Sequence, residues 1–489
     1  MNNSAVRTSR ALSSLSLVAS LYACQPPMEQ PDASSTPDGS AMNPPADGAT
    51  SPESEGGTLR DATVGGEDAS TPGSDGGGRA RASSFVRVGF YNQHLAVGAD
   101  DRVHLTFLDG AAERLHYASC TERCGEAESW QVTQLLSVSQ LSTITIGPYG
   151  IAVDSSGRLH MVASAVARAG QHQWELMYGT CASNCSSAPN WTFVDLSALA
   201  PNRSLITSVD TLMVRPNGRV SFLTAGVYNS VQPAYFECDG NCAQASQWRA
   251  INAPINGKPL RAALDSTGVT HVIFAGGRSN ANEELLQYAR CAGSCTNAAS
   301  WQSSMLGFLY VGADYETGFA IDSSDRLFVA YNQGTIAQAS TVNRRNLIAS
   351  CAGGDCLNLD RWSSVPVGDL EEGVGGNTLV RAGGGLVLAS VLEREVRVRS
   401  CDSNCATAEA WSAATTVDTS DAIARSVAPD LGSSCPGRSE SAAWWPRNPA
   451  LAVNSRGIVA VHNPHAIVKC PGDVNPMRVP PIGRVFASF

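Results

Sequence analysis

Fifteen cysteines are the most regularly spaced reactive residues of this chain. Twelve form six pairs of the pattern Cys-x3-Cys, with one extra residue inside the fifth pair, and a tryptophan stands six positions after each pair. Zinc requires four ligands and no histidine recurs at ligand spacing, so metal binding is the weaker alternative. We predict a local disulfide in each pair. The pairs are Cys120 and Cys124, Cys181 and Cys185, Cys238 and Cys242, Cys291 and Cys295, Cys351 and Cys356, and Cys401 and Cys405.

Three cysteines remain, and the first of them, Cys24, directly follows a predicted export signal, residues 1–23. Two arginines precede the apolar run Ala11–Tyr22, which is too short to span a bilayer. The sequence Leu21-Tyr22-Ala23-Cys24 resembles the bacterial lipobox, which implies cleavage before Cys24 and lipid attachment to it. A plain secretory signal is the alternative. Because Gln25 rather than aspartate follows, the resemblance implies a lipid-anchored protein of the outer membrane or cell surface.

Residues 24–83 are rich in proline, serine, aspartate and glycine and hold almost no large apolar side chains. Such a segment cannot bury enough surface to offset the entropy of ordering it. We therefore predict a disordered linker between the lipidated cysteine and a folded domain at 84–489. The formal net charge of −10 leaves no basic face for phosphates, so we expect no nucleic-acid partner.

A hairpin pattern recurs seven times, at intervals of 50 to 73 residues. Each copy has an apolar triplet, a four-residue turn and an alternating apolar run, and the last turn position is a glycine or aspartate, which is typical of a positive φ. With the strands around each cysteine pair, a repeat supplies four strands. We predict an all-β, seven-bladed β-propeller, with six or eight blades or two stacked sandwiches as alternatives. The turn residues are Asp101, Gly157, Gly218, Gly268, Asp325, Gly384 and Gly457.

The seventh copy is irregular. It has an apolar strand at His465–Cys470 but neither a second cysteine nor a tryptophan, and Cys435 is the one cysteine left over. We therefore predict a long-range disulfide between Cys435 and Cys470. We also expect the alternating segment Arg484–Phe489 to close the ring by pairing beside Phe85–Phe90.

Two short segments carry a family resemblance. Asp154–His160 and Leu176–Tyr178 resemble the repeats of bacterial secreted propellers of the Asp-box, or sialidase-like, group. The resemblance implies a propeller fold and leaves the activity open. This chain lacks the tryptophan that follows the glycine of a full Asp-box, and it lacks the Arg-Ile-Pro motif of sialidases.

Side chains that recur in the repeat are predicted to be structural. His104, His160 and His271 share one position that other copies fill with serine, phenylalanine, valine or alanine, so packing is favoured over a metal or catalytic ring. The turn aspartates, such as Asp154, are expected to accept hydrogen bonds within their own turns rather than bind calcium. The tryptophans are expected to wedge between blades rather than stack on sugars.

Function is expected where the repeat is broken. The largest break, Asp430–Pro449, contains Arg438, Trp444, Trp445 and Arg447, which we select as tentative binding residues. Aromatic rings beside charges suit a carbohydrate or peptide platform; variation in a surface loop is the alternative. No catalytic residue, metal site or cofactor is predicted.

The leading hypothesis is therefore a surface-anchored binding or scaffold propeller for glycan or protein. The alternative is an enzyme acting on polysaccharide, a glycosidase or lyase, which would need converging acids or a histidine–tyrosine pair at a pocket. A purely structural envelope protein is the third possibility.

Overall fold

Alternating apolar residues and tight turns give the described chain an all-β fold. This computed structural model describes residues within the compact unit Asp75–Phe489. They are residues 81–84 and 90–488, without 110–113, 138–142, 168–173, 202–210, 225–231, 281–282, 311–316, 334–342, 368–370, 373–374, 393–394, 420–448, 463–466, 469–476 and 479–483. Its helices are single 3₁₀ turns, and none of the described helices is long and apolar enough to cross a membrane.

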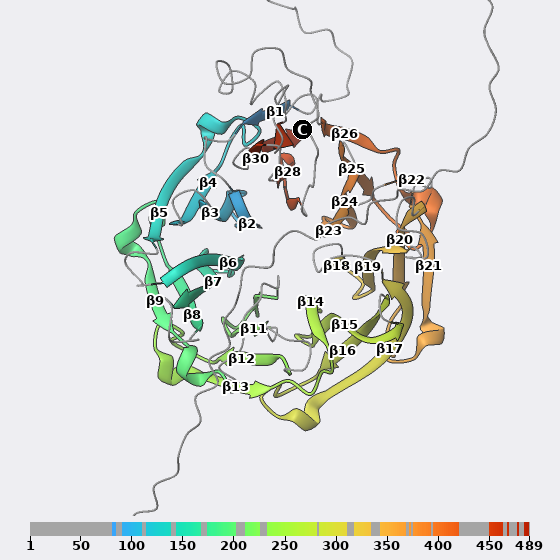
Figure 1. Ribbon diagram of the computed structural model, residues 1–489, viewed down its shortest axis with the longest axis horizontal. Coiled ribbons are helices and arrows are strands. Elements are labelled where there is room, and N and C mark those ends of the chain that lie inside the picture. Colours follow the sequence, from blue (N-terminus) through green and yellow to red (C-terminus); the bar gives the residue numbers. More distant parts are fainter. Residues whose placement is uncertain are drawn as a thin grey trace, which may run out of the picture. The chain divides into compact units, whose positions relative to one another are not determined.

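Six successive stretches of the chain each fold into an antiparallel sheet of four consecutive strands, which we call blades 1 to 6 (Figure 1). In chain order, their strands are β2 (Phe90–Val97), β3 (Val103–Asp109), β4 (Arg114–Cys120) and β5 (Gln131–Ser137); β6 (Thr143–Val153), β7 (Leu159–Ala167), β8 (Trp174–Cys181) and β9 (Thr192–Asp195); β10 (Met213–Val214), β11 (Val220–Thr224), β12 (Ala234–Cys238) and β13 (Trp248–Asn252); β14 (Lys258–Leu264), β15 (Thr270–Asn280), β16 (Glu283–Cys291) and β17 (Trp301–Tyr310); β18 (Gly318–Ile321), β19 (Leu327–Gln333), β20 (Asn343–Cys351) and β21 (Trp362–Pro366), with β22 (Glu371–Glu372) beside β20; and β23 (Gly375–Ala382), β24 (Gly385–Leu392), β25 (Glu395–Cys401) and β26 (Thr415–Thr419).

A composite sheet closes the ring. It pairs β27 (Ala450–Asn454) and β28 (Gly457–His462) with β31 (Arg484–Ser488), and β31 in turn with β1 (Arg81–Ser84). The first strand of each blade contacts the first strand of the next, and β27 contacts both β23 and β2. The ring is therefore held shut by strands from the two ends of the described chain.

The predicted seven-bladed propeller with small disulfides is wrong in its blade count. Six blades carry their own disulfide and four consecutive strands, whereas the seventh hairpin copy forms no such blade. That copy lacks the cysteine pair and the tryptophan, and β31 takes the place of its third strand. β29 (Ile467–Val468) pairs only with β30 (Met477–Arg478). The expected closure of the ring by the C-terminal segment is confirmed, but its partners differ: β31 pairs with β28 and with β1 rather than with Phe85–Phe90.

The hairpin turns follow the predicted pattern in most copies. Asp101 and Asp325 have φ values of 62° and 58°, and glycines fill the same left-handed position in three other blades. Blade 6 departs from the prediction, because its left-handed residue is Gly383, with φ 57°, rather than Gly384. The reason is a shorter turn: Ala382 pairs directly with Gly385, so only two residues connect β23 to β24.

The six tryptophans pack against the preceding sheet, as predicted. Each indole N–H donates to the carbonyl of the second cysteine of its own pair, at 2.8–3.1 Å. Four of these rings contact a buried tyrosine of the blade before, as Trp248 does with Tyr178 at 4.8 Å between centroids. Trp191 with Tyr117, Trp301 with Tyr235, and Trp362 with Tyr288 repeat this contact. The disulfide loop thus positions a wedge between blades.

A polar latch joins the composite sheet to blade 1. The backbone N–H of Ser455 donates to the Asp101 carboxylate at 3.1 Å, and its hydroxyl donates to the other carboxylate oxygen. Asn454 donates to the Asp101 carbonyl at 2.9 Å, and Arg456 donates to the Thr121 carbonyl at 2.7 Å. This explains why aspartate, rather than glycine, holds the left-handed position there.

The hydrogen bonds between Asp101 and Ser455 lead to a prediction that is tested by the direction in which the thermal midpoint changes. Asp101→Gly relieves the left-handed strain of a non-glycine residue, which by itself would stabilise the turn. We expect the variant instead to lower the thermal midpoint, because it removes both side-chain acceptors for Ser455. Differential scanning calorimetry of the variant and of Gly157→Ala, which is strained but has no latch, measures both contributions. An Asp101→Gly midpoint at or above that of the unaltered protein would contradict the latch.

Candidate inter-blade site

Buried Asp–His–Tyr arrays lie in blades 2 and 4. In blade 2, Tyr178 on β8 is 2.5 Å from Nδ1 of His160 on β7, and Nε2 of that histidine is 3.3 Å from the carboxylate of Asp154 in the β6–β7 turn. In blade 4, the corresponding distances are 2.7 Å from Tyr288 to His271 and 3.1 Å from His271 to Asp265. His160 and His271 are therefore packed structural residues, as predicted.

The protonation of these arrays follows from their burial. Burial lowers the pKa of His160 and raises that of Tyr178 above its usual value. The tyrosine therefore keeps its proton and donates to Nδ1, which leaves Nε2–H to donate to the aspartate. The other Asp154 oxygen accepts from the N–H groups of Ser156 and Arg158, both at 2.9 Å. The turn aspartates thus cap their own turns, as expected.

Blade 1 has the same pair without the aspartate. Tyr117 on β4 lies 2.7 Å from Nδ1 of His104 on β3, but the turn position of the aspartate is Gly98. A Cβ atom at Gly98 would lie 2.5 Å from Oδ1 of Asp100 and 3.3 Å from Nε2 of His104, so the Asp100 carboxylate already reaches into this space. Asp100 takes over only part of the missing role, because it accepts from the Arg102 N–H at 3.2 Å. Among the described residues, Nε2 of His104 has no hydrogen-bond partner.

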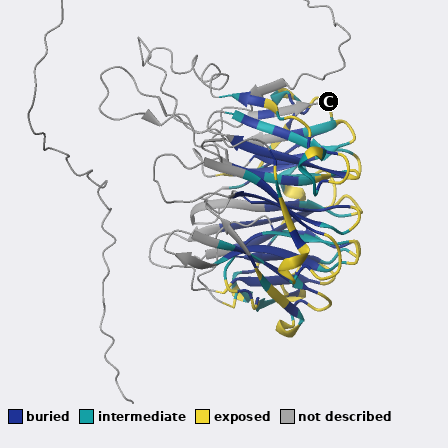
Figure 2. Cartoon of the chain, turned by 90° about the vertical axis from the view of Figure 1, so that its right-hand side faces the viewer, coloured by how far each residue is buried: buried dark blue, intermediate teal, exposed yellow. Residues whose placement is uncertain are grey.

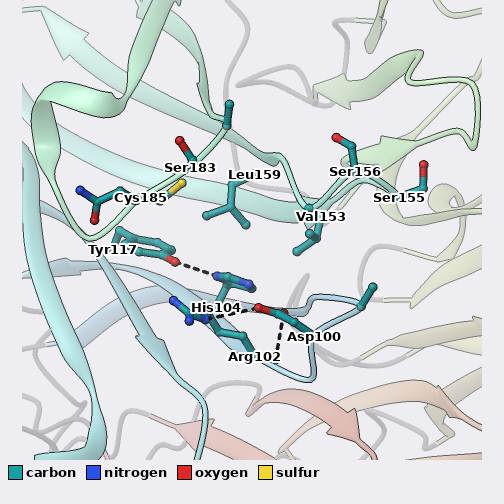
Figure 3. Close-up of a pocket in the computed structure, with 14 residues that line it drawn as sticks. Asp100, Arg102, His104, Tyr117, Val153, Ser155, Ser156, Leu159, Ser183 and Cys185 are labelled. Carbon is teal, nitrogen blue, oxygen red and sulfur yellow. Dashed lines mark hydrogen bonds and ion pairs between the residues drawn. The ribbon is translucent and has the colours of Figure 1, made fainter.

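A cavity of about 440 Å³ opens at this histidine, between blades 1 and 2 (Figure 3). Asp100, Arg102, His104 and Tyr117 form one side, and the other side comes from the β6–β7 turn and the disulfide loop of blade 2. Exposed residues of the described chain gather at one side of the ring (Figure 2). The lining from blade 2 includes Val153, Ser155, Ser156, Leu159, Ser183, Asn184 and Cys185.

The cavity combines neutral and charged polar groups. Burial lowers the pKa of His104 to about 4 and raises that of Tyr117 to about 12, so both are uncharged near neutral pH. The Arg102 guanidinium is 3.6 Å from the Asp100 carboxylate, and its buried Nε–H donates no hydrogen bond in the described structure. Two N–H donors at the cavity, on His104 and Arg102, therefore lack acceptors.

The lowered pKa of His104 predicts a pH dependence of stability. In the unfolded chain His104 is protonated below its ordinary pKa of 6.5, whereas in the folded chain it is protonated only below a pKa of about 4. The folded state is therefore destabilised as the pH falls from 6.5 to about 4. We expect a loss of about 3 kcal/mol from this histidine. Urea unfolding at pH 7 and pH 4 measures it. The double variant His104→Phe with Tyr117→Ile, which copies Phe328 and Ile348 of blade 5, should show a shallower dependence; an unchanged slope would contradict the assignment.

Blade 3 replaces the array with an ion pair. Arg215 stands at the aspartate position and lies 3.5 Å from Glu237, which also accepts from Tyr235 at 2.8 Å. The guanidinium reaches across to blade 4, where it donates to the Thr270 hydroxyl at 3.1 Å. Sequence analysis missed this network, although an arginine at a position that holds aspartate in blades 2, 4 and 5 was a usable signal.

Six of the seven predicted cysteine pairs are disulfides in the structure. Cys24 and the proposed pair of Cys435 and Cys470 lie outside the described residues. So do the four tentative binding residues, Arg438, Trp444, Trp445 and Arg447. Within the described part of the chain, no group of three or more histidine, cysteine, aspartate or glutamate residues is placed to hold a metal ion. The site described above therefore comes from the structure and not from the sequence prediction.

The fold defines the class of this protein, a β-propeller. No protein-family model and no curated protein matches the chain. Similar solved structures include the Hadza microbial sialidase Hz136, with 12% sequence identity and a TM-score of 0.43. The match covers 67% of this chain and 66% of the length of that sialidase. A second is the polysaccharide lyase Uly1, with 9% identity and a TM-score of 0.46 over 86% of this chain and 94% of that one. A third is a Trypanosoma rangeli sialidase in complex with the inhibitor DANA, with 11% identity and a TM-score of 0.43 over 78% of this chain and 68% of that one. At these identities and TM-scores the similarity says nothing about the activity of this chain. The resemblances to the Asp-box repeat and to the lipobox stay predictions.

Proposed function

We propose that this chain is a saccharide-binding β-propeller displayed at the bacterial cell envelope, with the cavity between blades 1 and 2 as its site. The observation that carries the proposal is the His104 imidazole, which lines an open cavity with an Nε2–H that has no acceptor in the described structure. This nitrogen lines the open cavity, so an oxygen atom of a ligand can accept its hydrogen bond.

The chemistry around the histidine suits a sugar. Asp100 accepts from hydroxyl groups, Arg102 and His104 donate to oxygen atoms, and Asn184 can do both. Leu159 and Val153 add an apolar wall for the face of a pyranose ring. Ligand sites for small molecules typically span about 300–1,000 Å³, and this cavity lies within that range.

A polysaccharide-acting enzyme, a glycosidase or lyase, is the second candidate. The observation in its favour is the convergence of His104, Tyr117 and Arg102 on one cavity. Two facts favour binding instead. The histidine–tyrosine pair recurs in blades 2 and 4, where the histidine is also bound to an aspartate of its own turn. Asp100 is the one carboxylate among the residues that line the cavity, whereas glycoside hydrolysis generally uses two.

A carbohydrate microarray with the folded protein tests the proposal. Saccharide binding that is lost with His104→Phe supports it, and binding to no saccharide contradicts it. Incubation of each bound polysaccharide, followed by measurement of reducing ends and of unsaturated products, separates the candidates. Product release would favour the enzyme.

The envelope location rests on Cys24. We propose that acyl chains on this cysteine hold the protein at the outer membrane or cell surface, and that residues 25–83 tether the propeller to it. The protein is expected to move from the membrane fraction to the soluble fraction on Cys24→Ala. If it stays with the membrane after this change, the lipid anchor is wrong.

A further inference from the structure

One disulfide differs from the other five in its access to solvent. Among the twelve cysteines of the six described disulfides, every one except Cys185 is buried, with at most 7% of its surface exposed. Cys185, the second cysteine of the blade-2 pair, is partly exposed and lines the cavity between blades 1 and 2. Its sulfur lies among the groups that line the cavity (Figure 3), whereas its partner Cys181 is 1% exposed. A solute in the cavity can therefore reach one sulfur of this disulfide.

The cavity suits a small thiol in size and in charge. Its volume of about 440 Å³ has room for a molecule of a few heavy atoms. Arg102 and Asp100 lie 3.6 Å apart and balance each other's charge. His104 is uncharged near neutral pH, because burial lowers its pKa to about 4. The cavity therefore does not repel a thiolate, which is the form of a thiol that attacks disulfides.

Attack from the cavity leaves both sulfurs in defined places. The thiolate forms a bond to Sγ of Cys185, the bond between the two Sγ atoms breaks, and its electron pair leaves with Sγ of Cys181, which takes a proton from water. The Cys181 sulfur lies 3.4 Å from the carbonyl oxygen of Ser183, to which the new thiol can donate. A second thiol that attacks the mixed disulfide completes a two-electron reduction, in which two small thiols become one disulfide and Cys185 becomes a thiol.

We propose that the Cys181–Cys185 disulfide is a thiol-exchange site, at which small-molecule thiols that enter the cavity form a mixed disulfide on Cys185. The other five disulfides have two buried cysteines each, so a thiol reaches them only when their blades open locally. Exchange at this site goes beyond saccharide binding and does not depend on it.

Peptide mass spectrometry of the folded protein tests the proposal. The protein is treated with excess 2-mercaptoethanol at pH 8, quenched with acid, which removes thiolates, and alkylated at its free thiols. We expect Cys181–Cys185 to react at least about tenfold faster than any other pair, with mercaptoethanol on Cys185 and the alkyl group on Cys181. Cys291–Cys295 is the matched reference in the same sample, because it closes a loop of the same length and both its cysteines are 0% exposed.

Variants that lack one disulfide give a second measurement. The double variant Cys181→Ser with Cys185→Ser should lose the fast phase of the reaction. The matched double variant Cys291→Ser with Cys295→Ser should keep it, although it also lacks one disulfide. Calorimetric unfolding shows that both variants fold, and the peptide map of the unaltered protein decides the question without them.

The possible failures are distinct. Reaction of Cys181–Cys185 no faster than that of Cys291–Cys295 would overturn the exchange site, whatever the protein binds. Mercaptoethanol found on Cys181 instead of Cys185 would contradict attack from the cavity and would also overturn it. Selective exchange at Cys185 in a protein that binds no saccharide on the array would support the exchange site and contradict the proposed function.

Discussion

Replacing Trp248 with alanine is expected to lower the free energy of unfolding by about 3–5 kcal/mol. The indole is 3% exposed and lies between blades 2 and 3, with ring centroids 4.8 Å from Tyr178 and 5.6 Å from Phe222. Its N–H donates to the Cys242 carbonyl at 2.9 Å, so the substitution removes a packing wedge and leaves a buried carbonyl without this donor. Equilibrium unfolding in urea measures the loss.

Two further variants show what the wedge contributes. Trp248→Phe keeps an aromatic ring between the blades and loses the hydrogen bond, so its loss should be smaller. Met305→Ala removes an apolar side chain of which 51% is exposed and should change the free energy of unfolding by less than about 0.5 kcal/mol. A loss for Trp248→Ala no larger than that for Met305→Ala would refute the role of the tryptophans as inter-blade wedges.

The second large effect is expected at the ion pair of blade 3. Arg215→Met leaves Glu237, whose side chain is 9% exposed, without its buried partner, and removes the donor to Thr270 in blade 4. Breaking a buried pair on one side is strongly destabilising, and we expect a loss of about 3 kcal/mol in the free energy of unfolding. The remaining contact of Glu237, with Arg219 at 3.8 Å, keeps the loss at the lower end of the usual range.

The matched variants are Arg219→Met and the double variant Arg215→Met with Glu237→Met. Arg219 is 26% exposed, so its loss should be small, and removing both buried charges should restore much of the stability lost with one. Unfolding in urea at neutral pH measures all three. If the double variant is less stable than Arg215→Met alone, Glu237 is not a stranded charge.

The repeat made most of the fold predictable. The spacing from each cysteine pair to its tryptophan identified six disulfides and the inter-blade wedges, because a five-residue loop holds the indole at a fixed place beside the next strand. Ring closure was harder to predict. The partners of β31 are β28 and β1, whose sequence Arg81–Ser84 has no apolar alternation and resembles the preceding linker. Pairing between chain ends depends on the geometry of the ring, which one sequence does not contain.

The candidate site was not predicted, for a physical reason. Sequence reasoning looked for function in the insertion with Trp444 and Trp445, where the repeat is visibly broken. The difference that the structure reveals lies in one turn, where Gly98 stands at the position that Asp154 holds in blade 2. Its consequence appears only when the turn is seen to place that side chain against Nε2 of a histidine six positions later.

The most direct test of this account follows the three histidine rings by NMR during titration with a saccharide that binds on the carbohydrate microarray. His160 and His271 serve as internal controls, because Asp154 and Asp265 already accept their Nε2–H groups. We predict that the ring signals of His104 shift and saturate with the ligand while those of the two controls stay in place. Saturable binding that leaves His104 unshifted, or that shifts all three histidines alike, would contradict a ligand site at the open array of blade 1.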